Sequence, residues 1–139
     1  MTGAARRVKN SIVYLLDSEG LSQTVRGVTA MKGRLKAAHL SGIRVMTTSM
    51  TLIEAYDVRT YLPAWHWALS RIHVEPVTEA IAKDAVELLK EAGLHGREYA
   101  IDAALPAVAL RQPGPVTVFT SDEDDLRKLC GDRVVVMGL

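Results

Sequence analysis

The stretch SIVYLLD, residues 11–17, gives the clearest indication of the fold. From Ile12 to Leu16 it is apolar on both faces of an extended chain and rich in residues that favour β-structure, and it ends at an acid, Asp17. A strand with two apolar faces is typical of the interior of a parallel sheet, where helices cover both sides. We therefore expect a buried strand with Asp17 just beyond its carboxyl end.

Short segments of the same kind alternate with longer segments of helical periodicity. The clearest helical pattern ends at Gly93, a residue that commonly stops a helix. Strands that alternate with helices predict right-handed crossovers and a parallel sheet with helices on both faces. Further strands are expected at residues 43–46, 116–119 and 134–137, and helices at residues 28–40, 51–62, 78–92 and 99–110.

The predicted fold class is therefore α/β, a three-layer α/β/α domain with a central parallel sheet. The length of 139 residues suits one domain spanning residues 1–139, and an apolar content of 48% is enough for a hydrophobic core. We expect residues 1–9 to form a loose basic tail. No apolar run approaches the roughly 18 residues that a membrane span needs. The single cysteine, Cys130, permits no internal disulfide, and we expect a cytoplasmic protein.

The net charge of +1 excludes a strongly basic nucleic-acid coat protein, but the charges are unevenly distributed. Residues 1–44 hold eight basic and two acidic side chains, a net charge of +6, whereas residues 45–139 have a net charge of −5. An acidic pocket formed by a few of the carboxylates would leave an otherwise modestly basic surface, weighted toward the N-terminal third.

Four carboxylates occupy positions that solvent exposure alone does not explain. Asp17 and Asp122 each follow a predicted strand, and the crevice beyond the carboxyl ends of the strands is where open α/β sheets bind ligands. Glu54 lies on a helix expected to start at the same edge. Asp102 lies in a nearly all-apolar segment, where an ionised carboxylate needs a partner or a cation. We expect Pro106, four residues later, to kink or break that helix beside Asp102.

Each acid also has a purely structural explanation. Thr51 and Glu54 fit a capping box, Asp17 could cap a helix, and Asp102 could form an internal salt bridge. The acids of residues 122–125 could simply stabilise a helix N-terminus. Four such explanations at once serve less well than one shared site.

A shared site of this composition predicts a metal ion. Clustered carboxylates repel one another unless a cation holds them, and a site of oxygen ligands without His or Cys suits Mg²⁺ or Mn²⁺. Such ions activate water and neutralise the charge that develops on a phosphate. The chemistry indicated is phosphodiester hydrolysis.

The order of these motifs resembles the PIN-domain nucleases, most closely the VapC-type toxins of bacterial toxin-antitoxin modules. The resemblance extends from about residue 10 to the end of the chain. The motifs that carry it are the strand followed by Asp17-Ser18, then Thr51-x-x-Glu54, then Asp102-Ala-x-x-x-Ala107, and finally Thr120-Ser121-Asp122-x-x-Asp125-Leu126.

The resemblance implies a PIN fold and an Mg²⁺- or Mn²⁺-dependent endoribonuclease that acts on RNA. It implies that Asp17, Glu54, Asp102 and Asp122 are catalytic and bind the metal, and that Asp125 is an additional ligand. Supporting hydroxyls would come from Ser18, Thr120 and Ser121. It further implies a homodimer and inhibition by a cognate antitoxin protein.

Two other functions remain open on the sequence. The first is a catalytically inactive protein that keeps the PIN fold and acts by binding an antitoxin-like partner or itself. The second is a phosphotransfer domain of the receiver or haloacid dehalogenase type, which also places acids at strand ends. The missing DxD after the first strand argues against the second.

Overall fold

The computed structural model describes residues 12–139 and contains one central sheet of five parallel strands. The strand order is β3-β2-β1-β4-β5, with β1 in the middle. The expected basic tail of residues 1–9 lies outside the described residues. The strands are β1 (Val13–Leu16), β2 (Arg44–Thr48), β3 (His73–Glu75), β4 (Val116–Thr120) and β5 (Val135–Gly138).

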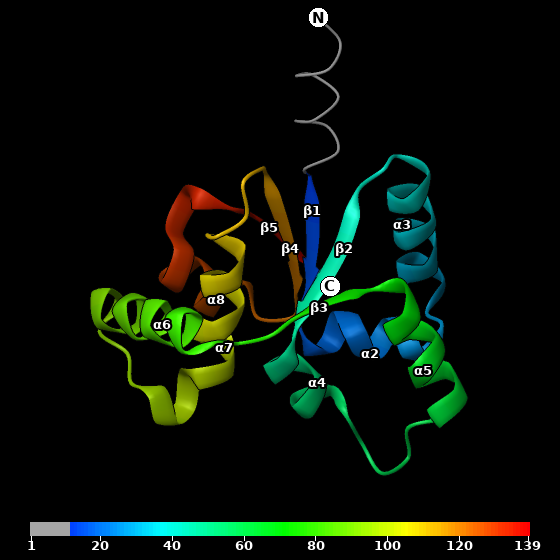
Figure 1. Ribbon diagram of the computed structural model, residues 1–139, viewed down its shortest axis with the longest axis horizontal. Helices are drawn as coiled ribbons and strands as arrows, with labels where there is room; N and C mark the ends of the chain where they lie inside the picture. The colour runs from blue at the N-terminus through cyan, green and yellow to red at the C-terminus, as the bar shows by residue number, and fades with distance from the viewer. Residues whose placement is uncertain (1–11) are drawn as a thin grey trace, which may run out of the picture.

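Helices cover both faces of the sheet, so the predicted three-layer α/β/α fold is confirmed (Figure 1). One face carries α6, α7 and α8, the other carries α2, α3 and α5, and α4 lies across the carboxyl end of the sheet (Figure 1). The helices are α2 (Ser18–Arg26), α3 (Thr29–Leu40), α4 (Ser49–Ala55), α5 (Leu62–Arg71), α6 (Glu79–Ala92), α7 (Gly96–Ala109) and α8 (Glu123–Cys130), with a short 3₁₀ turn at Gly131–Arg133.

The central strand β1 explains the two-sided core. Val13 and Leu15 belong to the apolar cluster under α6, α7 and α8, whereas Leu16 belongs to the cluster on the other face, with Tyr14 packed against it. Leu15 and Leu16 are both fully buried, at 0% exposure. Consecutive side chains of a strand point to opposite faces, so a strand apolar at every position requires cover on both.

The helix predicted over residues 78–92 forms as α6, with both ends defined by their own residues. Thr78 caps its start by accepting a hydrogen bond at Oγ1 from the Ile81 N–H, at 3.2 Å. Gly93 ends the helix at a φ of 68°, in the left-handed region that glycine adopts without steric cost.

The helix predicted over residues 51–62 is wrong in extent. Helix α4 ends at Ala55, and α5 begins only at Leu62. Between them the carboxylate of Asp57 accepts a hydrogen bond from the Arg59 N–H at 2.7 Å, while the Asp57 N–H donates to Thr60 at 3.1 Å. These local bonds satisfy the backbone in a turn and so compete with the helix.

Four elements were not among the strands and helices expected from the sequence, namely α2, α5, α8 and the edge strand β3. Strand β3 spans only His73–Glu75, too short for a periodic signal. Helices after Asp17 and at residues 122–125 were considered only as alternative explanations of the acids, and both form, as α2 and α8. The expected helix over 28–40 and the strand over 134–137 are both present, as α3 and β5.

The kink expected at Pro106 lies elsewhere. Pro106 is inside α7 and fully buried, yet the only non-helical backbone in this helix is at Tyr99, with φ −114° and ψ 15°. A proline removes a single helical hydrogen bond, and close packing of the residues around it holds the remaining turns in place. Asp102 therefore lies on regular helix, between the break at Tyr99 and the proline.

The strand order reverses at the boundary between β1 and β4. From β1 it moves to β2 and β3 on one side, and it then returns to β4 and β5 on the other. In parallel sheets such a switch point opens a crevice beyond the carboxyl ends of the two central strands. None of the helices within residues 12–139 has the length and apolar character needed to span a membrane.

The central position of β1 gives a stability prediction. Leu15→Ala should lower the free energy of unfolding by about 3 kcal/mol, because it leaves a cavity in the packed core. Val135→Ala is the matched control, since Val135 is also a strand residue but is 57% exposed on β5. It should cost less than about 1 kcal/mol. Urea unfolding of both variants checks this, and equal losses would contradict the assigned core.

Candidate metal centre

A cavity of about 230 Å³ opens at the switch point between β1 and β4. All four acids predicted from the sequence to form a site line it, although they come from four separate parts of the chain. Its lining residues are Asp17, Ser18, Thr51, Glu54, Ile101, Asp102, Leu105, Thr120, Ser121, Asp122 and Leu126.

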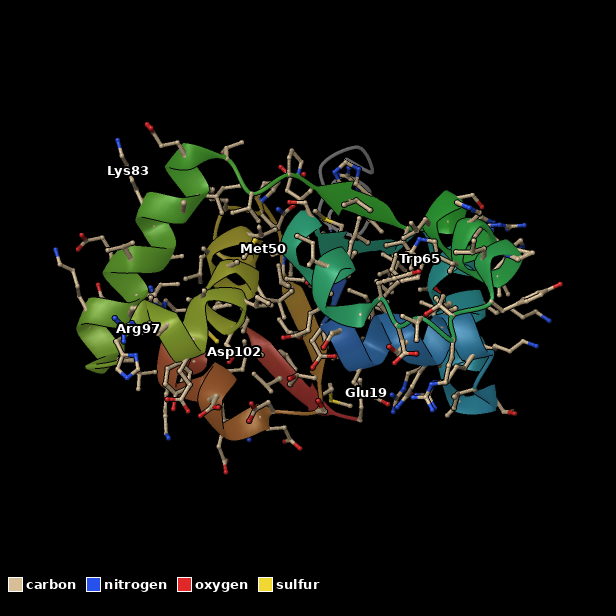
Figure 2. The ribbon with its side chains drawn as sticks, turned by 90° about the horizontal axis from the view of Figure 1, so that it is seen from below. Glu19, Met50, Trp65, Lys83, Arg97 and Asp102 are labelled. Atoms are coloured by element: carbon tan, nitrogen blue, oxygen red, sulfur yellow. The ribbon has the colours of Figure 1, made fainter. Side chains whose placement is uncertain are left out.

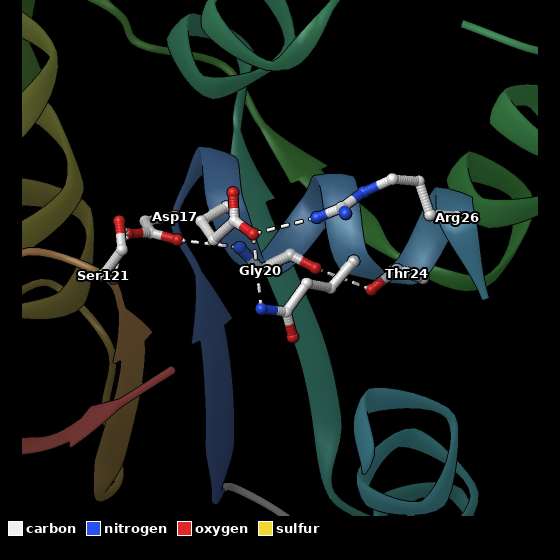
Figure 3. A network of polar contacts seen from close by, with 7 residues as sticks. Asp17, Gly20, Thr24, Arg26 and Ser121 are labelled. Carbon is white, nitrogen blue, oxygen red and sulfur yellow. Dashed lines mark hydrogen bonds and ion pairs between the residues drawn. The ribbon is translucent and has the colours of Figure 1, made fainter. Parts of the chain in front are cut away.

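Asp17 is held by backbone N–H groups from two elements (Figure 3). One carboxylate oxygen accepts from the Gly20 N–H at 2.8 Å and thereby caps α2, while the other accepts from the Ser121 N–H at 2.9 Å. The Asp17 N–H donates to the Phe119 carbonyl at 3.1 Å. Asp17 is thus both the helix cap considered from the sequence and a lining residue of the cavity.

Asp122 lies just beyond β4, at the N-cap position of α8, but its side chain makes no capping hydrogen bond. Its backbone N–H instead donates to Thr120 Oγ1 at 2.9 Å, which shapes the turn out of the strand. The acids of residues 123–125 do occupy the first turn of α8, where they favour the helix dipole. The Asp122 carboxylate is left available to the cavity.

The tightest group of carboxylates is Asp102, Asp122 and Asp125. One oxygen from each lies within 4.8 Å of the others, a spacing at which a single ion could be bound. The resemblance implied that Asp125 is an additional ligand. Its oxygen lies within the same distance limit of those of Asp102 and Asp122 as theirs do of each other, so Asp125 belongs to the central group of carboxylates. Asp17 and Glu54 line the same cavity but fall outside this triad.

The electrostatic state of Asp102 reflects this crowding. Its pKa is raised from 3.8 to about 6, first by burial and then by the nearby charges of Asp122, Glu54, Asp125 and Asp17, in that order. Every acid of the predicted site thus repels the ionised form of Asp102. A cation within the cavity would reverse this effect.

The pKa of Asp122 is raised in the same way. Partial burial is the first cause, and the neighbouring Asp125 carboxyl is the second. Like charges without a cation between them favour the protonated form of a carboxyl group. Proton and metal ion would compete for the same oxygens.

Glu54 lines the cavity as an exposed carboxylate on α4. The capping box with Thr51 considered from the sequence is wrong, because α4 starts earlier and is capped by Thr48. Thr48 Oγ1 accepts from the Thr51 N–H at 3.1 Å, and the two hydroxyl oxygens lie 3.0 Å apart. Glu54 therefore has no part in starting the helix.

Basic side chains within residues 12–139 do not neutralise the charge of the five clustered acids. The internal salt bridge considered for Asp102 does not form, and of the five acids only Asp125 makes an ion pair, with Lys128 Nζ at 3.7 Å. That pair is at the outer limit for a salt bridge and leaves four carboxylates without a cationic partner in the described chain. An oxygen-only donor set with uncompensated charge fits a hard divalent ion.

The hydroxyl groups expected near the site also lie there. Ser18, Thr120 and Ser121 all line the cavity, and the Ser121 hydroxyl is 3.5 Å from the Asp17 carboxylate. The apolar wall of the cavity was not predicted from the sequence and consists of Ile101, Leu105 and Leu126. The helical spacing of Ile101 and Leu105 around Asp102 was a usable signal, because i and i+4 residues share one face of a helix.

Similarity to known proteins is found among solved structures and not in sequence. The sequence matches no family model and no curated protein. Among solved structures, the chain is similar to that of VapBC2 from Rickettsia felis bound to a DNA fragment from their promoter, with a TM-score of 0.70. The likeness covers 91% of this chain and 98% of that one, at 14% sequence identity.

The fold is PIN-like. A parallel five-stranded sheet, helices on both faces and the near-complete coverage agree with the fold that the sequence resemblance implied. At 14% identity the likeness concerns the PIN-like fold and not the residues of the cavity. The roles of those residues are therefore argued from their own geometry.

The raised pKa of Asp102 predicts a pH effect on stability without metal. A protonated carboxyl in the folded state stabilises the protein fully below about pH 4, and this contribution is lost as pH rises through about 6. Asp102→Asn cannot ionise, so its advantage over the parent should be larger at pH 7 than at pH 4. Because the group is only half-buried, solvent screening reduces the expected difference to about 1 kcal/mol.

Urea unfolding in chelator at both pH values measures this difference. Asp132→Asn, which removes an exposed carboxyl outside the cavity, controls for the loss of one charge. An advantage of Asp102→Asn that is the same at pH 4 and pH 7 would contradict the repulsion among the acids.

Proposed function

We propose that this protein is a metal-dependent endoribonuclease, the toxin of a toxin-antitoxin pair. The observation that carries the proposal is the cavity at the β1/β4 switch point, where four carboxylates converge without a cationic partner among the described residues. An acidic pocket of this kind repels an RNA phosphate unless a divalent ion lies between them. The PIN-like fold places the pocket where ligands of parallel α/β sheets bind.

The triad of Asp102, Asp122 and Asp125 is the proposed holder of Mg²⁺ or Mn²⁺. When bound, such an ion activates water for attack on the phosphate and neutralises the charge on the displaced oxygen. The half-buried Asp102 offers its oxygen from the rigid, packed part of α7, while Asp122 and Asp125 offer theirs from the start of α8. The three carboxylates would hold the ion from two elements, α7 and the start of α8.

Asp17 and Glu54, which line the same cavity, are proposed to complete the set. Asp17 is fixed by two N–H donors, so its position is defined before any ion or substrate arrives. Glu54 is exposed and has no ion pair among the described residues, which suits a group that orients the attacking water or accepts its proton. Ser18 and Thr120 add hydroxyl groups to the cavity wall as hydrogen-bonding partners for water or phosphate oxygens.

Protein partners are part of the proposal. The similar solved structure is a VapBC2 complex, and this supports an antitoxin-type partner for the present chain. Exposed apolar side chains on α4 and the following loop, namely Ile53 at 74% and Val58 at 90% exposure, support association with a protein surface or a second copy. We propose an antitoxin partner and a homodimer on these grounds.

The alternative of a catalytically inactive binding protein keeps the same fold and partners. It has no independent support in the cavity, because a site used only for shape would not need four carboxylates in mutual repulsion. The phosphotransfer alternative loses its basis, since the fold is PIN-like and the acids converge from four elements.

Cleavage of single-stranded RNA is expected to require Mg²⁺ or Mn²⁺ and to depend on the cavity acids. Asp122→Asn and Asp17→Asn should each lower the rate by more than about 100-fold, which corresponds to about 2.7 kcal/mol of transition-state stabilisation. Asparagine is a good helix cap, so Asp17→Asn should leave α2 intact. Gel analysis of labelled RNA, with circular dichroism to show that the variants fold, measures both effects.

The matched control for this assay is Asp132→Asn, which should cut RNA at the parental rate. Cleavage by Asp17→Asn and Asp122→Asn at that same rate would remove the basis for the proposed site. Cleavage that persists in excess chelator would show that the reaction does not use a divalent ion.

Metal binding itself is expected to stabilise the folded protein. Millimolar Mn²⁺ should raise the Tm of the parent by about 3 °C or more, because the ion binds the native cluster and relieves its repulsion. The shift should be much smaller in Asp122→Asn and unchanged in Asp132→Asn. Thermal unfolding measures all three, and equal shifts would show that the ion binds elsewhere.

A further inference from the structure

A second, larger cavity lies beside the acidic one and has no part in the metal chemistry. It is a groove of about 750 Å³ between α2, the α4–α5 loop and the start of α5. Its distinctive residues are two arginine–carboxylate pairs and two aromatic rings, namely Glu19, Arg26, Asp57, Arg59, Tyr61 and Trp65. This groove is called the aromatic groove below.

The aromatic groove continues directly from the acidic cavity. On α2, Ser18 lines the acidic cavity and its neighbour Glu19 lines the groove. On α4, Glu54 lines the acidic cavity and Ala55 the groove. Figure 2 looks onto this edge of the molecule, with Asp102 on the side of α7 and with Glu19 and Trp65 on the side of α2 and α5. A chain-like ligand cut at one cavity would extend into the other.

From this arrangement we infer that the aromatic groove binds the single-stranded RNA that flanks the cut site. The inference rests on the proposed function and adds to it the path of the substrate. Single-stranded nucleic acid is commonly bound by cations that follow the backbone together with aromatic rings on which bases stack. Both kinds of group face the groove.

The aromatic rings have the exposure that stacking requires. Tyr61 is 70% exposed on the α4–α5 loop, so its ring is open to a base. Trp65 is half-buried on α5 and is braced edge-to-face by Tyr56, with ring centroids 5.9 Å apart. A braced ring loses little conformational entropy when a base stacks on it, which favours binding.

Each arginine of the groove pairs with a carboxylate, yet its guanidinium group stays exposed and available to a phosphate. Arg26 lies 2.9 Å from Glu19, and Arg59 lies 3.1 Å from Asp57, with guanidinium side chains 59% and 88% exposed. Exposed pairs of this kind contribute little free energy, so a phosphate can replace the carboxylate at small cost. Glu19 and Arg26 both belong to α2, the helix that the Asp17 carboxylate caps, and Arg26 is labelled in Figure 3. Until RNA arrives, the carboxylates keep the arginines oriented.

The same residues indicate that the bound RNA is single-stranded and not double-stranded. Stacking on Tyr61 and Trp65 requires bases that are free of a complementary strand, because a duplex hides its base faces. The groove therefore selects unpaired RNA, such as a loop or a single-stranded end, over a double helix.

The test measures RNA binding in chelator, so that no cleavage is needed. Trp67→Phe leaves Trp65 as the only tryptophan, and titration with a ten-nucleotide single-stranded RNA should change its fluorescence in a saturable way. Tyr61→Leu should weaken the affinity about tenfold, the size expected for one lost stacking contact. Arg26→Gln with Arg59→Gln should make the slope of log K against log salt concentration about 1.4 less steep, at about 0.7 for each phosphate.

Matched controls remove the same chemistry elsewhere. Lys83→Gln with Arg111→Gln breaks two exposed ion pairs outside the groove, those with Glu79 and Asp84. Trp67→Leu removes an aromatic side chain that is 52% exposed and does not line the groove. Both controls should bind RNA like the parent with an unchanged salt slope. A duplex of the same sequence should bind the parent more weakly than the single strand.

Several outcomes would overturn the inference. One is that the groove variants bind RNA with the parental affinity. Another is that RNA binds without changing the fluorescence of Trp65. If Tyr61→Leu alters the sedimentation of the protein but not its RNA affinity, the groove is an interface between copies. If the groove variants cleave RNA in a metal-dependent reaction with the parental KM, the groove does not bind the substrate, and the proposed nuclease still stands. Groove-dependent binding without metal-dependent cleavage refutes the proposed nuclease and leaves the groove standing.

Discussion

The parallel pairing of β1 with β4 at the centre of the sheet is the constraint on which the rest of the structure depends. It buries β1 on both faces and brings the ends of two strands, distant in sequence, to one point. The Asp17 carboxylate then joins the two ends, through the Gly20 N–H on one side and the Ser121 N–H on the other. The direction in which α2 and α8 leave the sheet, and hence the shape of the acidic cavity between them, follows from this junction.

Near that junction, repulsion among clustered carboxylates destabilises the folded protein. Asp102 is held in a packed helix beside four other acids, and burial together with their charges raises its pKa to about 6. A fold selected for stability alone would place a cation or an apolar side chain there. Uncompensated charge in a preformed cavity is instead the arrangement that a divalent ion stabilises, and it is the physical basis for the proposed nuclease.

The helix α2 links the two cavities of the molecule. Its first turn borders the acids, and its last turn carries Arg26 to the aromatic groove. The two cavities have complementary character, since one concentrates negative charge for a cation and the other offers arginine and aromatic rings. The two arginines of the groove come from both parts of the sequence, Arg26 from the basic N-terminal third and Arg59 from the more acidic remainder.

The sequence by itself determined the layer architecture and the positions of the acids. Apolar strands such as SIVYLL, helical periodicity and the stop at Gly93 are local signals, and a carboxylate that follows a buried strand must lie at the sheet edge. Only the tertiary structure decided which acids meet. Three-dimensional packing placed Asp125 in the tight triad, gave Asp17 its two N–H partners and assigned the cap of α4 to Thr48. It also moved the break in α7 to Tyr99 and created the aromatic groove from α2 and a loop that the sequence had suggested was helix. The carboxylate triad and the Asp17–Ser121 contact join residues far apart in the chain, and periodicity and spacing carry no information about such contacts. The Thr48 cap and the Asp57 turn are local contacts that compete with equally plausible local alternatives in the sequence.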